Sequence, residues 1–519
     1  MAAATVTEAA IDRRRLADRS FWVALLLAFV VLAAWAVASP HMAAPDEPAH
    51  AAKAAATVRG QFAAEEARFR PGRGTFEVPA LFQQAWAQPC FAYQPDVPGG
   101  CAPEIGGDLE TIVPVESHVA RYNPVYYALV GLPSLLPLSE HTFTAMRLVG
   151  ALINALLLAL TFRIIAGLRR PLLPMLGLFA ALTPMVFFVG ASISPQGPEV
   201  FGALLVGTGL MALVFDPRRE VLVSRAWAVA AGTVFFALAR GLSPGYLLLI
   251  VALVALAAPR FETLRDIVSD RRVWPPLVVC AAVSVGAVAY TLLSGSLALG
   301  IVFPDPALTA QDVIMRMLLD TGAYAEQVIG VFGWGDVRLP LAILAALGGV
   351  VLIVVALGFR FASWRGRIVL ALLLAASVVV PIAVQLMSFR ESGLVWQGRY
   401  VMPLVLQAPL LAGFLAGTGR MRIRTSAVVL TSAVGVLAIA HSAAVAVNLH
   451  RYIAGAGGPW FGVVDGAWQP ALPAVVIAGA VAASWIVAAV LVARFAVRAS
   501  EVDGVIRSAA PDRSDSSVG

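Results

Sequence analysis

Continuously apolar stretches of about 20 residues recur along this 519-residue chain and are separated by short polar segments. Each stretch is long enough to cross about 30 Å of hydrocarbon as a helix. The stretches do not alternate apolar and polar residues with a period of two, which favours helices over a barrel. The pattern predicts an all-α integral membrane protein with about 12 transmembrane helices, within a range of about 11–13. The expected spans are residues 21–39, 143–165, 172–190, 198–216, 225–241, 243–259, 274–294, 339–359, 367–388, 401–418, 425–447 and 471–493.

The distribution of arginines predicts the orientation of these spans. All of the 37 basic residues except Lys53 are arginine, a bias typical of a GC-rich bacterial genome. The arginines gather between expected spans, and the positive-inside rule places such segments in the cytoplasm. These segments are residues 163–170, 218–225, 260–272, 360–367, 420–424 and the tail from 494. The sequence therefore predicts a protein of the bacterial cytoplasmic (inner) membrane with both termini cytoplasmic. Topology accounts for the net charge of +6, so no nucleic-acid partner is needed.

This topology divides the chain into a membrane domain with two tails. We expect a cytoplasmic N-terminal tail over 1–20, a polytopic membrane domain over 21–497 and a disordered cytoplasmic tail over 498–519. Four outer loops follow, at about 40–142, 295–338, 389–400 and 448–470. The apolar piece 123–138 carries Pro133 and Pro137, and a crossing there would place every later arginine segment outside. We expect it to be an interfacial or re-entrant element.

Cysteine positions agree with this sidedness. Cys90 and Cys101 lie in the first outer loop, where an oxidising exterior favours a disulfide worth roughly 2–4 kcal/mol. Cys280 lies inside an expected span and is interpreted as a packing residue. No spacing of cysteines and histidines matches a zinc site.

The run Pro45-Asp46-Glu47-Pro48-Ala49-His50 is the strongest candidate for chemistry, because it places an acid pair where the chain leaves the first span. Asp46 could act as a general base toward a hydroxyl, supported by Glu47 or His50. Asp46 and Glu47 could instead hold a divalent cation, magnesium or manganese, that activates the hydroxyl. A structural alternative is a helix start, in which the acids cap the first turn of an alanine-rich helix.

Further polar residues near the outer surface are candidates for binding a substrate. An arginine at the outer mouth of a span suits a phosphate, which it can bind through two parallel hydrogen bonds, although it could also be an interfacial arginine. Glu199 lies near hydrocarbon depth, where such residues are usually buried and functional, although a turn glutamate in water is the open alternative. Arg240 breaks the positive-inside pattern on the outer side of a span, which favours an anionic partner. For Asp336 a role in stabilising its loop is equally open. The candidate binding residues are His50, Arg121, Glu199, Arg240, Trp334, Asp336, Gln397, Arg399 and Tyr400.

Four short runs together resemble the recurring motifs of a bacterial integral-membrane family that carries a domain of unknown function. They are Pro45-Asp46-Glu47-Pro48-Ala49-His50, Asn123-Pro124-Val125-Tyr126-Tyr127, Phe332-Gly333-Trp334 and Gln397-Gly398-Arg399-Tyr400. The resemblance covers residues from about 20 to 450, and it groups the chain with the GT-C membrane glycosyltransferases. Asn123 stands where related transferases often have a basic residue, so a phosphate-binding role is not carried over to it.

The resemblance implies a GT-C-like fold with a large first outer loop and a polyprenyl-phosphate sugar as donor. It also implies that Asp46, with Glu47 adjacent, takes the catalytic place as base or metal ligand. The preferred interpretation is an inverting glycosyltransferase that moves the sugar to a glycan or lipid acceptor of the cell envelope, at the outer face of the membrane. No nucleotide-binding fingerprint is present, which favours a lipid-linked donor.

Two other classes of function stay open. Twelve spans also suit a transporter or flippase of lipid-linked glycans, although the sequence shows no pair of corresponding broken helices. A non-catalytic membrane scaffold of an envelope-polymer complex is the third interpretation. It predicts that the outer polar residues can be replaced without loss of function.

Overall fold

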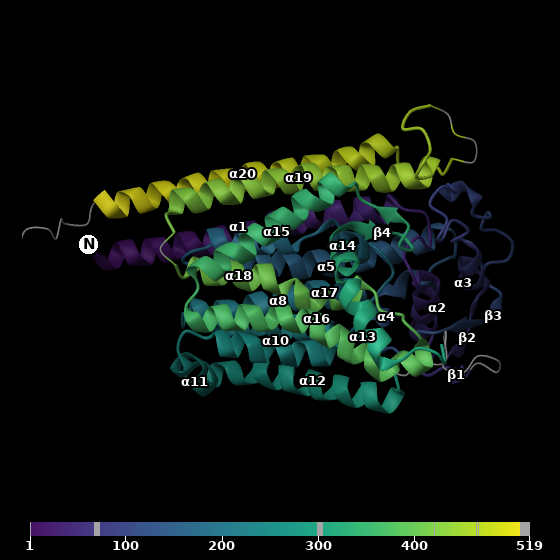
Figure 1. Ribbon diagram of the computed structural model, residues 1–519, viewed down its shortest axis with the longest axis horizontal. Helices are drawn as coiled ribbons and strands as arrows, with labels where there is room; N and C mark the ends of the chain where they lie inside the picture. Colours follow the sequence, from purple (N-terminus) through teal and green to yellow (C-terminus); the bar gives the residue numbers. More distant parts are fainter. Residues whose placement is uncertain are drawn as a thin grey trace, which may run out of the picture.

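The computed structural model describes residues 2–66, 73–297, 305–419, 421–462, 464 and 467–508. Its long helices run side by side along the long axis of the molecule (Figure 1). Within the described residues, nine helices are long and apolar enough to cross a membrane, or up to eleven if each of two bent pairs is one span. They include α1 (Ala2–Val37), α5 (His141–Ala166), α8 (Gln196–Phe215), α12 (Trp274–Ser294), α15 (Leu341–Phe361), α16 (Trp364–Ser392), α19 (Ile423–Ala454) and α20 (Ala474–Ser508).

Each of the other predicted spans also coincides with helical structure. Residues 398–417 form one span from η5 (Gly398–Val401), α17 (Met402–Val405) and α18 (Gln407–Gly417). The helix α9 (Leu222–Ala237) is apolar but has only 16 residues, fewer than a full crossing usually needs. The predicted number of about 12 spans therefore stays a prediction. The stretch predicted to be an N-terminal tail is the first part of α1, which begins at Ala2. Residues 509–519 of the predicted C-terminal tail lie outside the described residues.

Two helix pairs are bent. The pair α6 (Leu172–Ala181) and α7 (Pro184–Gly190) bends by 64°, at a break that precedes Pro184, whose ring and missing N–H interrupt a helix. At the break, His441 donates to the carbonyl of Leu182 at 2.9 Å, and the side-chain hydroxyl of Thr183 donates to the carbonyl of Val328 at 2.7 Å. The second pair, α10 (Ser243–Ala257) and α11 (Phe261–Ser269), bends by 119°. It is followed by η4 (Arg271–Val273).

The first outer loop folds into a small mixed layer at one end of the bundle (Figure 1). Its core is α2 (Glu47–Val58), an alanine-rich helix that is buried along almost its whole length. The antiparallel sheet β1-β2-β3 packs on it, with Phe76 opposite Val115 in the β2–β3 register. The bounds are β1 (Glu65–Glu66), β2 (Gly74–Pro79), α3 (Ala80–Gln84), η1 (Ala85–Ala87), η2 (Gly99–Cys101) and β3 (Ile112–Ser117).

The prediction of an all-α fold is thus correct for the spans and wrong for this outer layer. Strands β2 and β3 have only six residues each, and β2 alternates buried and less buried positions over its first part. Such short strands do not stand out among apolar runs of about 20 residues, and only their packing on α2 gives them a buried face.

The piece predicted to be interfacial consists of α4 (Pro124–Val130) followed by η3 (Leu132–Leu135), and neither is long enough to cross a membrane. The exposed side chains of Leu132, Leu135 and Leu136 are typical of an element that lies at an interface. Arg59 fixes this piece to the end of α2 through two hydrogen bonds to Ser134, at 2.9 and 2.6 Å.

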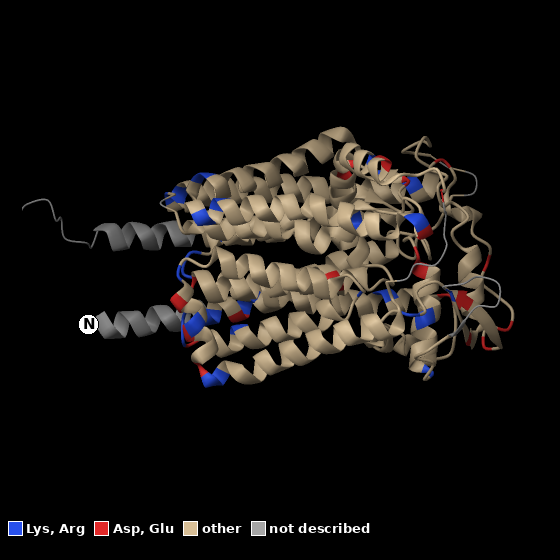
Figure 2. Ribbon diagram, turned by 60° about the horizontal axis from the view of Figure 1, so that its bottom comes forward, with Lys and Arg blue, Asp and Glu red and all other residues tan. Residues whose placement is uncertain are grey.

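The other outer segments are short and rest on the same end of the molecule. Residues 305–338 form α13 (Ala310–Leu319), α14 (Thr321–Gly330) and a hairpin of β4 (Val331–Phe332) and β5 (Val337–Arg338). The predicted disulfide is present: Cys90 and Cys101 are joined, with their Cα atoms 6.1 Å apart. Arginines are dense at the opposite end of the bundle (Figure 2). This agrees with the arginine pattern, while the orientation in the membrane stays a prediction.

Candidate functional site

Asp46 lies in a strained turn between α1 and α2. Its φ is 66°, a left-handed conformation that is uncommon for residues other than glycine and costs about 1–3 kcal/mol. It occupies the N-cap position of α2 but makes no capping hydrogen bond through its side chain. The side chain instead points to two basic groups: Oδ1 lies 3.1 Å from Nε2 of His118, and Oδ2 lies 3.2 Å from a terminal nitrogen of Arg399. The helix start predicted as the structural alternative is therefore present, but a capping hydrogen bond does not account for the orientation of this carboxylate.

Both basic partners are held in place by buried neighbours. His118 follows β3 directly, and the hydroxyl of Ser117 fixes the strand end to α2 by donating to the carbonyl of Ala49 at 3.0 Å. Arg399 lies in η5, where Gln196 of α8 donates to its carbonyl oxygen at 2.5 Å. A side chain at Gly398 would collide with the backbone of Tyr324, so glycine allows η5 to approach α14 closely.

Asp46 is ionised although it is partly shielded from water. Burial on its own would raise the pKa of Asp46, but the hydrogen bond from His118 and the positive charge of Arg399 outweigh it and hold the pKa below its ordinary value. Its side chain and that of His118 are each 34% exposed, so the pair is accessible from outside. A carboxylate with a lowered pKa is a weak proton acceptor, which bears on its chemical role.

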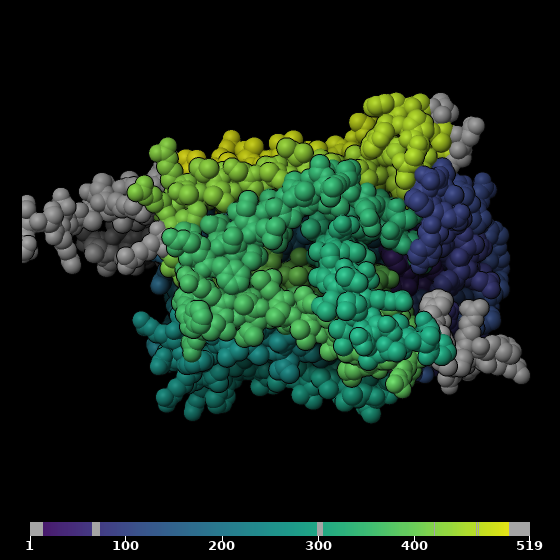
Figure 3. All heavy atoms as spheres, viewed as in Figure 1, coloured from purple at the N-terminus to yellow at the C-terminus, as the bar shows by residue number. Residues whose placement is uncertain are grey.

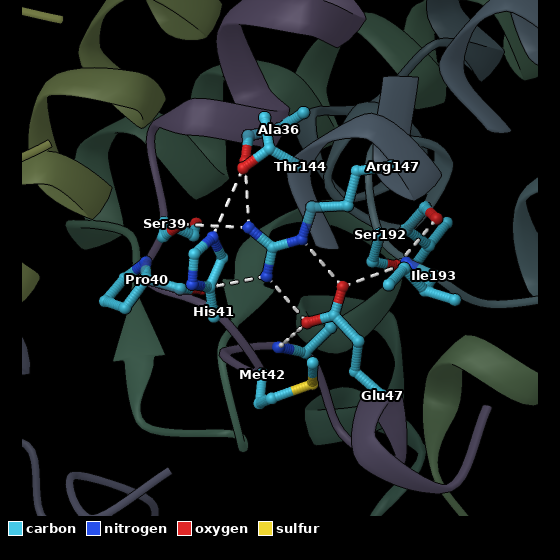
Figure 4. Close-up of polar contacts among 12 residues, drawn as sticks. Ala36, Ser39, Pro40, His41, Met42, Glu47, Thr144, Arg147, Ser192 and Ile193 are labelled. Atoms are coloured by element: carbon cyan, nitrogen blue, oxygen red, sulfur yellow. Dashed lines mark hydrogen bonds and ion pairs between the residues drawn. The ribbon is translucent and has the colours of Figure 1, made fainter. Parts of the chain in front are cut away.

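Glu47 has the opposite environment, although it is the next residue. Its side chain is completely buried and forms a bidentate pair with Arg147 of α5, at 2.7 and 2.6 Å (Figure 4). Backbone N–H groups of Ala44 and Ile193 donate to the same carboxylate. Burial would raise the pKa of Glu47, but Arg147 holds it below its ordinary value. No side of this carboxylate faces the exterior, so we assign it to the scaffold.

Arg147 completes this scaffold. Besides Glu47, it donates to the carbonyls of Ala36, Ser39 and Pro40 at 2.8–3.0 Å, so all five N–H donors of its guanidinium are used (Figure 4). These contacts join α5 to the end of α1 and to the turn before α2. The pair therefore fixes the backbone that carries Asp46.

Glu199 and Arg240 form another ion pair close to that of Asp46 and Arg399. Their side chains are 3.7 Å apart, and Ser243 donates to Glu199 at 2.7 Å. The guanidinium of Arg240 lies 4.6 Å from the ring centre of Tyr400, and that of Arg399 lies 5.1 Å from the same ring. The structure thus brings Arg240, Arg399 and Tyr400 together with Asp46, and it gives Arg240 an internal anionic partner.

The remaining predicted residues fall into different settings. His50 is buried and its Nδ1 lies 2.7 Å from the hydroxyl of Tyr127; burial lowers the pKa of His50 to about 3. Gln397 accepts a hydrogen bond of 2.7 Å from Arg399 and helps to orient it. Asp336 pairs at 2.6 Å with Arg451, whose two terminal nitrogens also donate to carbonyls of the disulfide loop.

Trp334 and Arg121 border the site at greater distance. The indole of Trp334 donates at 3.1 Å to the carbonyl of Met42, a second residue of the strained turn with positive φ. The exposed ring of Tyr93 packs edge-on against Trp334 at 5.6 Å. Arg121 lines a cavity of about 460 Å³ between the outer sheet and the end of α12, together with Arg73.

The donor set does not fit the divalent cation that the sequence suggests. Each oxygen of Asp46 already faces a basic group, and Glu47 is enclosed by Arg147 and backbone N–H groups. Among the residues that the structure describes, no group of three His, Cys, Asp or Glu side chains could hold a metal ion. We therefore assign no role in this site to a metal ion.

Sequence reasoning missed three residues that shape this site. His118, Arg147 and Arg451 lie about 70, 100 and 115 residues from the carboxylates that they pair with. His118 is one of only six histidines and lies in the outer loop, which was the available signal. Arg147 and Arg451 lie inside or at the end of helices, where arginine is ordinarily assigned to the membrane boundary.

Fold and site together define a multi-span α-helical membrane protein with a folded outer layer and a charged cluster where that layer meets the helices. The family model of predicted membrane proteins known as DUF2142 matches residues 29–408, so the chain belongs to this family. Comparisons with curated proteins and with solved structures gave no significant match.

Proposed function

We propose that the protein is an inverting membrane glycosyltransferase of the GT-C class, with its site on the outer face of the bacterial cytoplasmic membrane. It takes a sugar from a polyprenyl-phosphate donor and transfers it to a glycan or lipid of the cell envelope. The observation that supports this most is the strained, partly exposed Asp46 between His118 and Arg399, beside Arg240 and Tyr400. A strained residue within a cluster of charged groups at one accessible point is typical of an active site.

In this proposal, the acceptor hydroxyl attacks the anomeric carbon from the face opposite the phosphate. The bond between the anomeric carbon and the phosphate oxygen breaks, and the lipid phosphate leaves with the electron pair. Arg399 and Arg240 are the cations that offset the charge of the leaving phosphate. The proton of the hydroxyl passes to the Asp46–His118 pair. Tyr400 and the aromatic rings around it provide stacking surfaces for sugar rings.

A lipid-linked donor needs access from the side of the molecule. The face that carries α13, α14 and α15 is hollowed beside these helices, and atoms of the early, purple part of the chain are visible within the hollow (Figure 3). The strained turn belongs to that early part of the chain. This shape is consistent with a polyprenyl tail that lies between helices while its phosphate reaches the outer layer.

One observation favours the flippase alternative, namely the break between α6 and α7, because broken helices often mark transport sites. At this break the carbonyl of Leu182 is bound by His441, and the hydroxyl of Thr183 joins the break to α14 by donating to the carbonyl of Val328. Movement of a labelled lipid-linked glycan across sealed vesicles without covalent change would favour the flippase.

The proposal is tested with purified protein in nanodiscs and a panel of radiolabelled polyprenyl-phosphate hexoses and pentoses. Transfer to cell-envelope extract and release of free labelled sugar by water are both measured, with and without EDTA. We expect wild type to transfer label and Asp46→Asn to lose about 10²–10⁴-fold in rate. A folded Asp46→Asn protein that is as fast as wild type would contradict the proposal. Loss of activity in EDTA would contradict our assignment of a metal-free site.

A further inference from the structure

His118 is placed to take part in the reaction itself. Its imidazole is fixed on one side by the 3.1 Å contact between Nε2 and Asp46. On another side, the exposed ring of Trp86 packs edge-on at 6.3 Å. With 34% of the side chain exposed, the ring is oriented and still open to a ligand.

The contact with Asp46 determines which nitrogen carries the proton. An ionised carboxylate only accepts hydrogen bonds, so Nε2 of His118 must be the donor. In the neutral ring the other nitrogen, Nδ1, then has a free lone pair. No hydrogen bond to Nδ1 is present among the residues that the structure describes, and both oxygens of Asp46 are engaged. The basic atom open to an incoming hydroxyl is therefore Nδ1.

We propose that Nδ1 of His118 is the general base, and that Asp46 orients the ring and stabilises the imidazolium. This inference rests on the proposed function and assigns its proton acceptor. As the acceptor oxygen bonds to the anomeric carbon, its proton moves to Nδ1 and the lipid phosphate departs with the electrons of the broken bond. The imidazolium later returns the proton to water. Atoms and charge balance without a metal or a redox partner.

The charged groups that face His118 are consistent with this role. Asp46 supplies the negative charge that an imidazolium needs. The nearby basic groups are His50, which burial keeps neutral because its pKa is lowered to about 3, and Arg399, which is bound to the other oxygen of Asp46. A positive charge on His118 is thus offset by its direct neighbour.

The decisive variant is His118→Gln, because the side-chain amide of glutamine can still donate to Asp46 but has no basic atom in place of Nδ1. We expect it to fold with the melting temperature of wild type and to lose about 10²-fold or more in kcat, with little change in the KM of the donor. His118→Ala should lose activity as well, and added imidazole should restore part of it as a diffusible base.

The outcomes separate this inference from the function on which it rests. If wild type transfers sugar and His118→Gln keeps half of its kcat while His118→Ala does not, His118 only positions Asp46 and the inference is wrong. A His118→Ala protein that imidazole does not rescue, next to an active His118→Gln, leads to the same conclusion. If wild type neither transfers nor hydrolyses any donor of the panel, the proposed function fails and the inference fails with it.

Discussion

Asp46 and Glu47 are neighbours in the chain, yet the structure gives them opposite roles. Glu47 is completely buried, with both oxygens bound by Arg147 and by backbone N–H groups. Asp46 is partly exposed, with φ in the left-handed region, and faces His118 and Arg399 across the outer surface. Of the two adjacent acids, Glu47 thus stabilises the turn, and Asp46 is exposed by it.

The difference teaches how such a turn is stabilised. A left-handed conformation at Asp46 costs about 1–3 kcal/mol and persists only if the surroundings fix it. The Glu47–Arg147 pair joins α1, α2 and α5 around the turn, and Ile193 adds the segment between α7 and α8. The scaffold acid therefore provides the rigidity that the exposed acid requires.

The largest effect is expected where the scaffold pair is broken. Glu47→Gln and Arg147→Met each leave a buried partner without its counter-charge, which costs about 3–5 kcal/mol of unfolding free energy. Thermal unfolding in nanodiscs measures this as a fall in melting temperature. The double variant should be less destabilised than the sum of the two, and additive effects would show that the two groups do not depend on each other.

The next effect concerns the basic partner of the exposed acid. Arg399→Met removes the cation beside Asp46 and leaves Arg147 in place, and we expect about 10²-fold slower transfer. The melting temperature should change much less than in Arg147→Met, because the scaffold pair is intact. Equal losses of stability in the two arginine variants would contradict the division between scaffold and site.

A smaller effect is expected in the dependence of stability on pH, through the buried His50 of α2. Its pKa is lowered to about 3 in the folded chain and is about 6.5 in an unfolded one. Between these values the unfolded state binds more protons, so stability is full above pH 6.5 and falls as the pH drops. The slope is about 1.4 kcal/mol per pH unit. The variant His50→Asn should lose this slope, and melting temperatures at pH 7 and pH 5 compare the two proteins.

The smallest effect is expected at Trp334, which stabilises the strained turn through a hydrogen bond. Trp334→Phe keeps a ring but loses the hydrogen bond to the carbonyl of Met42, which is worth about 1 kcal/mol. We expect a small fall in melting temperature and a comparable small fall in transfer rate, because the turn also carries Asp46. Trp460→Phe is the matched control: the ring of Trp460 is exposed and stacks on His450, phenylalanine keeps that stacking, and neither quantity should change.

The sequence by itself determined the membrane-embedded helices, because apolar runs of about 20 residues have few other stable arrangements in water or lipid. It also determined the Cys90–Cys101 disulfide, and it places the polar residues Asp46, Arg240, Arg399 and Tyr400 between or at the ends of the apolar runs. Each of these follows from local composition along the chain.

Only the tertiary structure decided how these residues are used. The separation of Asp46 from Glu47 depends on Arg147 and His118, which approach from about 100 and 70 residues away. The three-stranded sheet also needed α2 as a packing surface before its short strands could bury a face. Contacts between distant segments depend on packing geometry, which no local pattern of residues encodes, and at this site they separate a scaffold acid from an exposed one.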